Sequence, residues 1–311
     1  MEKRNFLERA LTGPNEWWKY LLVFFVGLLG GQVIGSLPLL ITVLIRMIST
    51  GEFTSFTSEN LLSKNLAFGL IIFSTFVSLV LTVVLIGAIN HRTSTEIVNG
   101  TKIVRRDRVV FAFAVSFVLM AIYSGIDYFW HPDNYVLQTN WGKFAVFFVL
   151  SVVSVPILGI YSELLFRGYL TQGIGAGTHS RWWAWILPAL IFALFTSIMP
   201  SQASREFGIS YMASSSLFLG LLLGLIAILD DGIELSIGFI VGTSLFPMLF
   251  VTHSASPIPT ESLFRLKQFD PHQDVISTML IGLIAFVIFY RKYRWNFKIM
   301  NQRVGKKETR D

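Results

Sequence analysis

Hydrophobic segments of roughly 20 residues, the length that an α-helix needs to cross a bilayer, recur along nearly the whole chain. Short polar segments separate them. The pattern predicts eight spans, at about 18–45, 66–90, 109–125, 144–166, 182–199, 210–229, 233–252 and 273–290. The predicted fold is therefore all-α, a polytopic membrane helical bundle of about eight transmembrane helices that occupies residues 18–290.

Two further patterns concern the packing of these spans and their connections. Glycines at a spacing of four let helix backbones approach closely, and three spans carry them: Gly27, Gly31 and Gly35; Gly220 and Gly224; Gly238 and Gly242. The longer connections, 46–65, 126–143 and 253–272, carry aromatic and acidic residues and are predicted to be ordered caps. The chain lacks an internal repeat of the kind found in inverted-repeat transporters.

The composition supports a membrane protein and excludes several chemistries. Of the 311 residues, 53% are hydrophobic and 14% are charged, against about 25% charged in soluble proteins. The chain has no cysteine, which excludes disulfides, thiol catalysis and cysteine-ligated zinc. It also lacks His-Glu-x-x-His, so a zinc protease is not supported. We expect neither a metal nor a cofactor.

The distribution of positive charge predicts the orientation. If both termini lie on one side, that side holds 19 of the 25 lysines and arginines, in residues 3–19, 92–108, 167–181 and 291–310. The positive-inside rule places this side in the cytoplasm. We therefore expect a multi-pass protein of the plasma (inner) membrane with both termini cytoplasmic. The basic loop at 102–108 and the basic tail, 291–311, are interpreted as topogenic signals that contact anionic lipid, and not as nucleic-acid sites.

The N-terminal segment, residues 1–17, lacks the hydrophobic core of a cleavable signal peptide. Phe6, Leu7, Ala10 and Leu11 can form a short interfacial helix before the first span. This segment is expected to be cytoplasmic.

The first candidate for chemistry is a charged pair in "YSELLFRGYLTQG", residues 161–173. Glu163 and Arg167 lie four residues apart and therefore share one helical face. Glu163 comes 20 residues after Lys143, or about 30 Å along a helix, which places it at the cytoplasmic edge of the bilayer. The pair is either an interfacial ion pair or, if it turns into the bundle, a functional site.

This segment, with "FALFTSIMP" and "DDGIELSIGFIVGTSLF", resembles the CPBP family of CAAX-protease-like (formerly Abi) glutamyl intramembrane endopeptidases. The resemblance covers about residues 140–252 and implies an eight-span bundle with a cytoplasm-facing cavity. The family's motifs are two adjacent glutamates with an arginine four residues later, Phe-x-x-x-His and His-x-x-x-Asn. The resemblance implies that the first glutamate and first histidine activate a water, and that the second histidine and the asparagine stabilise the oxyanion.

This chain matches only part of those motifs. Glu163 and Arg167 correspond to the second glutamate and the arginine, and are expected to be structural. The family's reactive positions hold other residues, in chain order Ser162, Thr196, Phe239 and Thr243. Serine needs a base beside it to act near neutral pH, and phenylalanine neither donates nor accepts a hydrogen bond.

Other polar residues near these motifs have simpler interpretations. His179, in "QGIGAGTHS", is the one histidine that could reach Glu163, but a loop histidine is usually solvated. That glycine-rich stretch is predicted to be a flexible cytoplasmic loop. Asp230, Asp231 and Glu234 resemble a metal-binding cluster, although a tight turn at "DDG" is favoured.

The favoured function is a CPBP-like membrane protein with lost or weak peptidase activity. It would bind a membrane protein or peptide partner through the inherited cytoplasm-facing cavity. One alternative is an active intramembrane endopeptidase that uses Glu163, and another is a transporter-like bundle. The sequence does not identify the partner or substrate.

Overall fold

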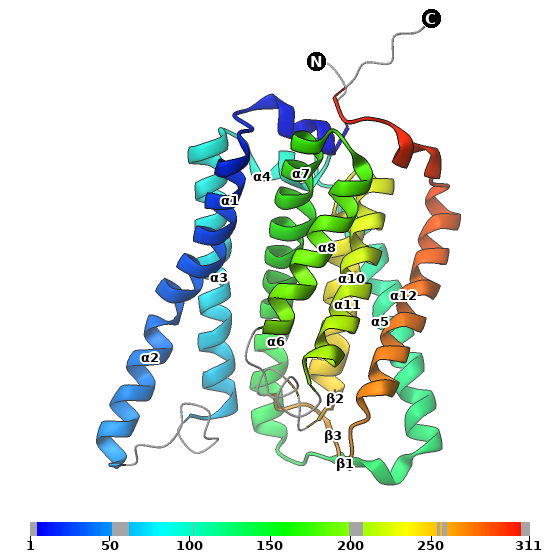
Figure 1. The fold of residues 1–311 in the computed structure, drawn as a ribbon. Helices are drawn as coiled ribbons and strands as arrows, with labels where there is room; N and C mark the ends of the chain where they lie inside the picture. Colours follow the sequence, from blue (N-terminus) through cyan, green and yellow to red (C-terminus); the bar gives the residue numbers. More distant parts are fainter. Residues whose placement is uncertain are drawn as a thin grey trace, which may run out of the picture.

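The computed structural model describes residues 5–51, 62–101, 103–198, 208–253, 256 and 260–305 (Figure 1). Residues 52–61 of the predicted cap at 46–65 lie outside these residues. Long helices run side by side through the molecule, and the first and last described residues lie at one end, which we call the terminal end. Three short strands lie at the opposite end, the strand end.

The predicted all-α membrane bundle is confirmed. Within the described residues, seven helices are long and apolar enough to cross a membrane, and an eighth apolar helix is shorter. The long helices are α1 with α2 (Trp17–Phe25 and Gly31–Thr50, joined by the π-helical turn η2, Val26–Gly30), α3 (Lys64–Asn90), α5 (Arg106–Trp130), α6 to α7, α8 (Arg181–Ile198), α10 (Ile209–Leu229) and α12 (Pro271–Tyr293). The shorter one is α11 (Glu234–Phe250), which contacts α5, α6 and α10 and is largely buried.

The fourth span is longer than the sequence predicted. Helix α6 (Trp141–Glu163) passes directly into a π-helical turn, η4 (Leu164–Leu170), and then into α7 (Thr171–Thr178). The prediction of a flexible loop at "QGIGAGTHS" was therefore wrong. A side chain at Gly173 would overlap the ring of Tyr20, and one at Gly175 would touch Leu7. These glycines let the helix pack closely on the N-terminal segment, and that packing outweighs their low helix propensity.

The glycine spacing correctly predicted where helices approach closely. A Cβ added at Gly238 would overlap the carbonyl oxygen of Val109, and one at Gly242 would lie 2.7 Å from that of Phe113. Helix α11 is thus pressed against the backbone of α5. Gly31 contacts Ser78 in the same way, which joins α2 to α3.

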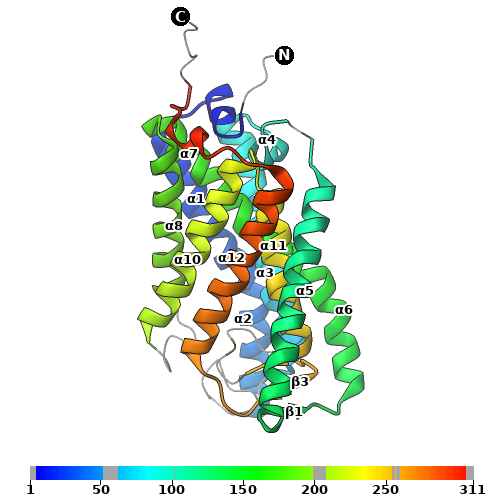
Figure 2. The ribbon, with the colours of Figure 1, turned by 90° about the vertical axis from the view of Figure 1, so that its right-hand side faces the viewer.

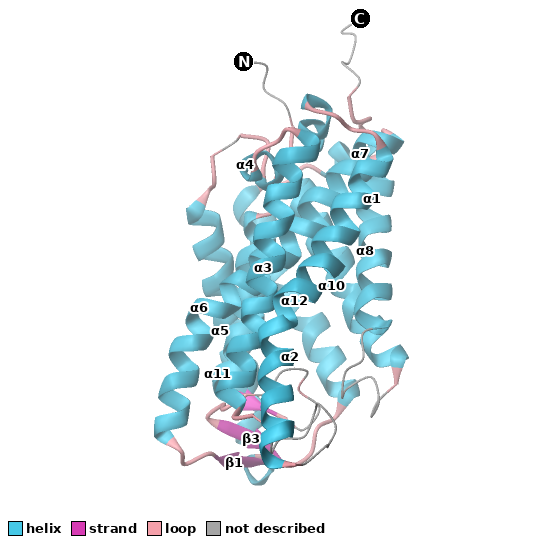
Figure 3. Cartoon of the chain, turned by 90° about the vertical axis from the view of Figure 1, so that its left-hand side faces the viewer, coloured by secondary structure: helices cyan, strands magenta, loops and turns pink. Residues whose placement is uncertain are grey.

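The strand end is closed by a small sheet, as the predicted ordered caps led us to expect (Figure 3). Strand β3 (Phe264–Leu266) lies between β1 (Tyr135–Leu137) and β2 (Val251–Thr252). It pairs antiparallel with β1, with Leu266 opposite Tyr135, and parallel with β2. Connections that are far apart in the sequence therefore form one structure.

The terminal end is covered by the first and last described segments of the chain. The predicted N-terminal helix is a 3-10 helix, η1 (Leu7–Thr12), and its Leu7 and Ala10 are buried against α7 and the protein core. After α12, the chain forms η5 (Phe297–Asn301) and crosses the same end (Figure 2). The short helix α4 (Ser94–Val98) also lies at this end.

Candidate functional site

The retained charged pair lies inside the bundle. Arg167 Nη1 donates a hydrogen bond to Glu163 Oε1 at 3.0 Å, and the side chains are 3% and 0% exposed, respectively. Glu163 ends α6, and the seven residues of η4 and the eight of α7 continue the helix beyond it. The helix therefore continues well past the pair, whereas the span predicted from the sequence ended at about residue 166.

Arg167 also contacts the second motif. Its guanidinium carbon lies 4.1 Å from the ring centroid of Phe192, on α8. The ring of Phe166 lies 5.0 Å from the same phenylalanine, at a steep angle. The first and second motifs of the family are thus brought together, and the arginine is held between a carboxylate and an aromatic face.

The substituted hydroxyls are engaged with their own helices. Ser162 Oγ donates to the Gly159 carbonyl at 3.2 Å, and Thr196 Oγ1 donates to the Phe192 carbonyl at 2.8 Å. Thr243 Oγ1 donates to the Phe239 carbonyl at 3.0 Å. Each hydrogen bond joins a side chain to a carbonyl three or four residues earlier, a common arrangement in helices. None of these three hydrogen bonds joins one motif to another.

The third motif lies on a helix next to the first. A Cβ at Gly159 of α6 would lie 2.7 Å from Cγ2 of Val241 on α11, so these two helices are in close contact. Phe239, at the position of the family's second histidine, is 1% exposed and belongs to the main hydrophobic core. An apolar ring therefore fills the place where the resemblance implies an oxyanion-stabilising donor.

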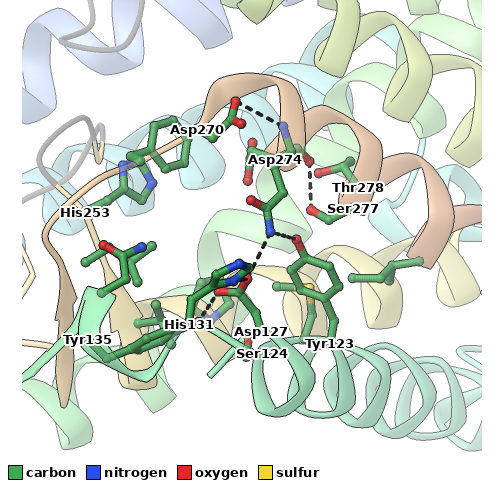
Figure 4. Close-up of a pocket in the computed structure, with 18 of the residues that line it drawn as sticks. Tyr123, Ser124, Asp127, His131, Tyr135, His253, Asp270, Asp274, Ser277 and Thr278 are labelled. Atoms are coloured by element: carbon green, nitrogen blue, oxygen red, sulfur yellow. Dashed lines mark hydrogen bonds and ion pairs between the residues drawn. The ribbon is translucent and has the colours of Figure 1, made fainter. Parts of the chain in front are cut away.

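A cavity of about 870 Å³ reaches part of this region from the strand end (Figure 4). It lies between α5, α10, α11 and α12 and includes Phe239 and Thr243 in its wall, but not Ser162, Glu163 or Thr196. In the predicted orientation this cavity faces outward, whereas the resemblance led us to expect one that faces the cytoplasm. The orientation itself stays a prediction.

His179 contacts the C-terminal tail. It follows α7 with a left-handed backbone (φ 54°). Its Nδ1 lies 3.0 Å from the Val304 carbonyl oxygen, and its own carbonyl accepts a hydrogen bond from Val304 N–H. His179 thus anchors the C-terminal tail, whereas the hydrogen-bond partner of Glu163 is Arg167.

The sequence missed a buried ionic cluster at the terminal end. The turn predicted at "DDG" is present, but Asp230 pairs with Arg105 and Arg108, and Glu234 pairs with Arg105 at 2.5 Å. Trp295 Nε1 donates to Asp230 Oδ1 at 3.0 Å. Within the described ranges, no group of three or more histidine, aspartate and glutamate side chains is arranged to hold a metal ion. These acids form an ionic cluster with the two arginines, and no local sequence pattern predicts it.

Comparison with known proteins identifies the family. Residues 141–296, from α6 to the segment after α12, match the family model described as "Type II CAAX prenyl endopeptidase Rce1-like". The chain belongs to the Rce1-like family. It is also similar to an uncharacterized protein, YyaK, of Bacillus subtilis (strain 168), with 25% identity over 301 residues that cover 93% of this chain and 97% of the relative. No solved structure matches it.

The family match covers a larger part of the bundle than the sequence motifs did. The match extends beyond the stretch at 140–252 on which the resemblance rested, because it includes α12. The three motif-bearing helices α6, α8 and α11 all lie within it. The family match therefore covers all three helices that carry the predicted motifs.

Proposed function

We propose that this Rce1-like membrane protein has lost peptidase activity and acts by binding a membrane protein or peptide partner. One observation carries the proposal. The one motif carboxylate, Glu163, is sealed against Arg167 with no exposed surface, and the four reactive positions offer no base and no histidine.

The chemical requirements show why this loss matters. Hydrolysis of a peptide bond needs a group that takes a proton from water, and donors directed at the developing oxyanion. Neither Ser162 nor Thr196 accepts protons near neutral pH, and Phe239 provides no donor. Loss of a single oxyanion donor costs about 10²–10³ in rate. The joint loss of base, partner and donor is expected to abolish measurable turnover.

The alternative, an active endopeptidase, has one observation in its favour. Glu163 Oε2 and Arg167 Nη2 are buried and have no hydrogen-bond partner among the described residues. These atoms are the ones that a bound water or substrate group would contact. Against this alternative, Glu163 has no exposed surface, and its Oε1 already accepts a hydrogen bond from Arg167.

Hydrolysis by the purified full-length protein in lipid nanodiscs tests the proposal. The assay uses a mixture of quenched fluorescent peptides, with and without a prenyl group, and wild-type protein beside Glu163→Gln and Ser162→Ala. We expect no protein-dependent hydrolysis from any of them. Hydrolysis by wild type that Glu163→Gln abolishes and Ser162→Ala retains would establish the alternative.

The binding role is proposed together with the orientation in a plasma membrane, where the basic segments would contact anionic lipid. Because the chain has no cysteine, single cysteines report topology without background. Gln302→Cys at the terminal end should be protected from an impermeant thiol reagent in whole cells, and Thr139→Cys at the strand end should be labelled. The reverse pattern would overturn the orientation.

A further inference from the structure

The cavity at the strand end has the size and shape of a ligand site. Its volume of about 870 Å³ falls within the range of roughly 300–1,000 Å³ typical of small-molecule pockets. Its walls come from four helices and from the segments on both sides of β1 and β3. Elements far apart in the sequence therefore enclose one space that opens beside the sheet.

The lining changes from apolar to polar along the cavity. Hydrophobic side chains, including those of Met120, Leu219, Phe239 and Ile281, come from the bundle. Polar groups from α5 and α12 lie nearer the strand end, and Gln273 Nε2 bridges them, at 3.2 Å from Tyr123 Oη and 3.0 Å from Asp127 Oδ1. A ligand that fits both regions has an apolar body and a polar group.

The charge of the lining determines which charge the polar group of the ligand should carry. Four carboxylates line the cavity, from Asp127, Asp133, Asp270 and Asp274, and one lysine, Lys267, faces them. Figure 4 shows Asp127 and Asp274 on opposite walls, from α5 and α12. An excess of carboxylates in a recess between low-dielectric walls attracts cations and repels anions.

The inner carboxylates are held by neutral donors and a histidine, not by lysine or arginine. Asp127 accepts hydrogen bonds from Tyr135 Oη at 2.5 Å and from Gln273, and its Oδ1 lies 3.1 Å from His131 Nδ1. Asp274 accepts one from Tyr211 Oη at 2.7 Å. Among the described residues, no lysine or arginine forms an ion pair with either acid. Their positions are therefore fixed, while their charge is not balanced by a permanent cation.

Aromatic faces complete the lining. Tyr123, Trp130 and Tyr135 contribute rings, and on the opposite side the rings of His253 and Phe269 stack at 3.8 Å with an interplanar angle of 7°. Rings beside carboxylates suit organic cations, whose charge is spread over a bulky group. A small hydrated ion does not use such faces.

We propose that this cavity is a binding site for a small organic cation that carries an apolar body. The cation would lie between Asp127 and Asp274, with the apolar body directed toward Phe239. The site goes beyond the function proposed above, because it does not involve Glu163 and does not depend on peptidase activity.

Two ions of equal shape and opposite charge test the proposal. The full-length protein in zwitterionic nanodiscs is titrated with tetraphenylphosphonium and, separately, with tetraphenylborate, and empty nanodiscs give the background. We expect saturable, protein-dependent binding of the phosphonium only. Asp127→Asn and Asp274→Asn should each weaken it by about tenfold, the effect of losing one charge contact in a partly buried site.

Asp107→Asn is the matched control. Asp107 lies on α5 like Asp127, but it is exposed and in the first turn, at the other end of the helix, so binding should not change. Thr278→Phe fills the cavity without altering any carboxylate and should abolish binding, and it replaces the asparagine variants if they unfold. Equal binding of both ions, no saturable binding, or unchanged binding in Thr278→Phe would overturn the proposal.

Discussion

Replacing one member of the Glu163–Arg167 pair should destabilise the protein far more than replacing both. The side chains are 0% and 3% exposed, and Arg167 Nη1 lies 3.0 Å from Glu163 Oε1. Neither charge can reach water when the other is removed. Breaking a buried ion pair costs about 3–5 kcal/mol, so we expect losses in this range for Glu163→Leu and for Arg167→Met.

The double variant Glu163→Leu/Arg167→Met removes both charges and keeps a similar volume. Apolar replacement of a buried pair is often neutral or stabilising. The loss of the contact between Arg167 and Phe192 removes about 0.5–2 kcal/mol. The double variant should therefore be about 2 kcal/mol less stable than wild type at most, and more stable than either single variant.

Unfolding in mixed micelles, followed by the fluorescence of the eight tryptophans, measures these differences. Glu16→Gln, in the exposed pair with Lys19, is the control and should leave the midpoint unchanged. The reasoning is refuted if both single variants unfold within about 1 kcal/mol of wild type, well below the cost of an unpaired buried charge. It is refuted equally if the double variant is as unstable as the sum of the two.

Three further predictions concern packing and charge elsewhere. Gly238→Ala should lower stability by about 1–3 kcal/mol, the usual cost of overpacking, because its Cβ would overlap the carbonyl oxygen of Val109. Gly125→Ala, with no atom within 4 Å of the added Cβ, should leave stability unchanged. Equal unfolding midpoints for the two variants would contradict this prediction. Trp295→Phe removes the hydrogen bond to Asp230 and should lower the free energy of unfolding by about 1–3 kcal/mol. The C-terminal tail should then be cleaved faster by added protease, and an unchanged cleavage rate would argue against a docked tail. Burial lowers the pKa of His253 from 6.5 to about 4. Between pH 6.5 and about 4, the unfolded chain therefore binds a proton at this histidine and the folded protein does not. Stability should fall as the pH decreases through this range. The melting temperature of His253→Phe should decrease less than that of wild type between pH 7 and 4.5, and parallel curves would exclude this residue as the cause.

Features that depend on local composition could be predicted from the sequence. Span length and apolarity gave the bundle, and the spacing of Gly238 and Gly242 gave the close packing of α11. The i, i+4 spacing gave the Glu163–Arg167 ion pair. In each case the residues that produce the feature are neighbours along one helix, so the pattern is visible in a short window.

Features that depend on distant contacts could not be predicted. Three glycines in "QGIGAGTHS" favoured a loop, and the contacts of Gly173 with Tyr20 and of Gly175 with Leu7 explain why a helix forms there. Arg105 and Glu234 are 129 residues apart, and no local pattern pairs them. Likewise, the Gln273–Asp127 hydrogen bond in the cavity joins residues 146 apart. The position of this cavity at the strand end therefore could not be anticipated from the family motifs alone.

The cover at the terminal end has a consequence for biosynthesis. The backbone N–H of Phe6 donates to Asp231, 225 residues later in the chain, and Asp230 in turn accepts from Trp295. During translation, the hydrogen bond of Phe6 cannot form until α10 and the Asp231 that follows it have been made. The hydrogen bond to Asp230 cannot form until Trp295, after α12, has been made. Such long-range closures form late. A nascent chain that stalls before Trp295 would therefore lack the hydrogen bond that this residue donates to the acid cluster.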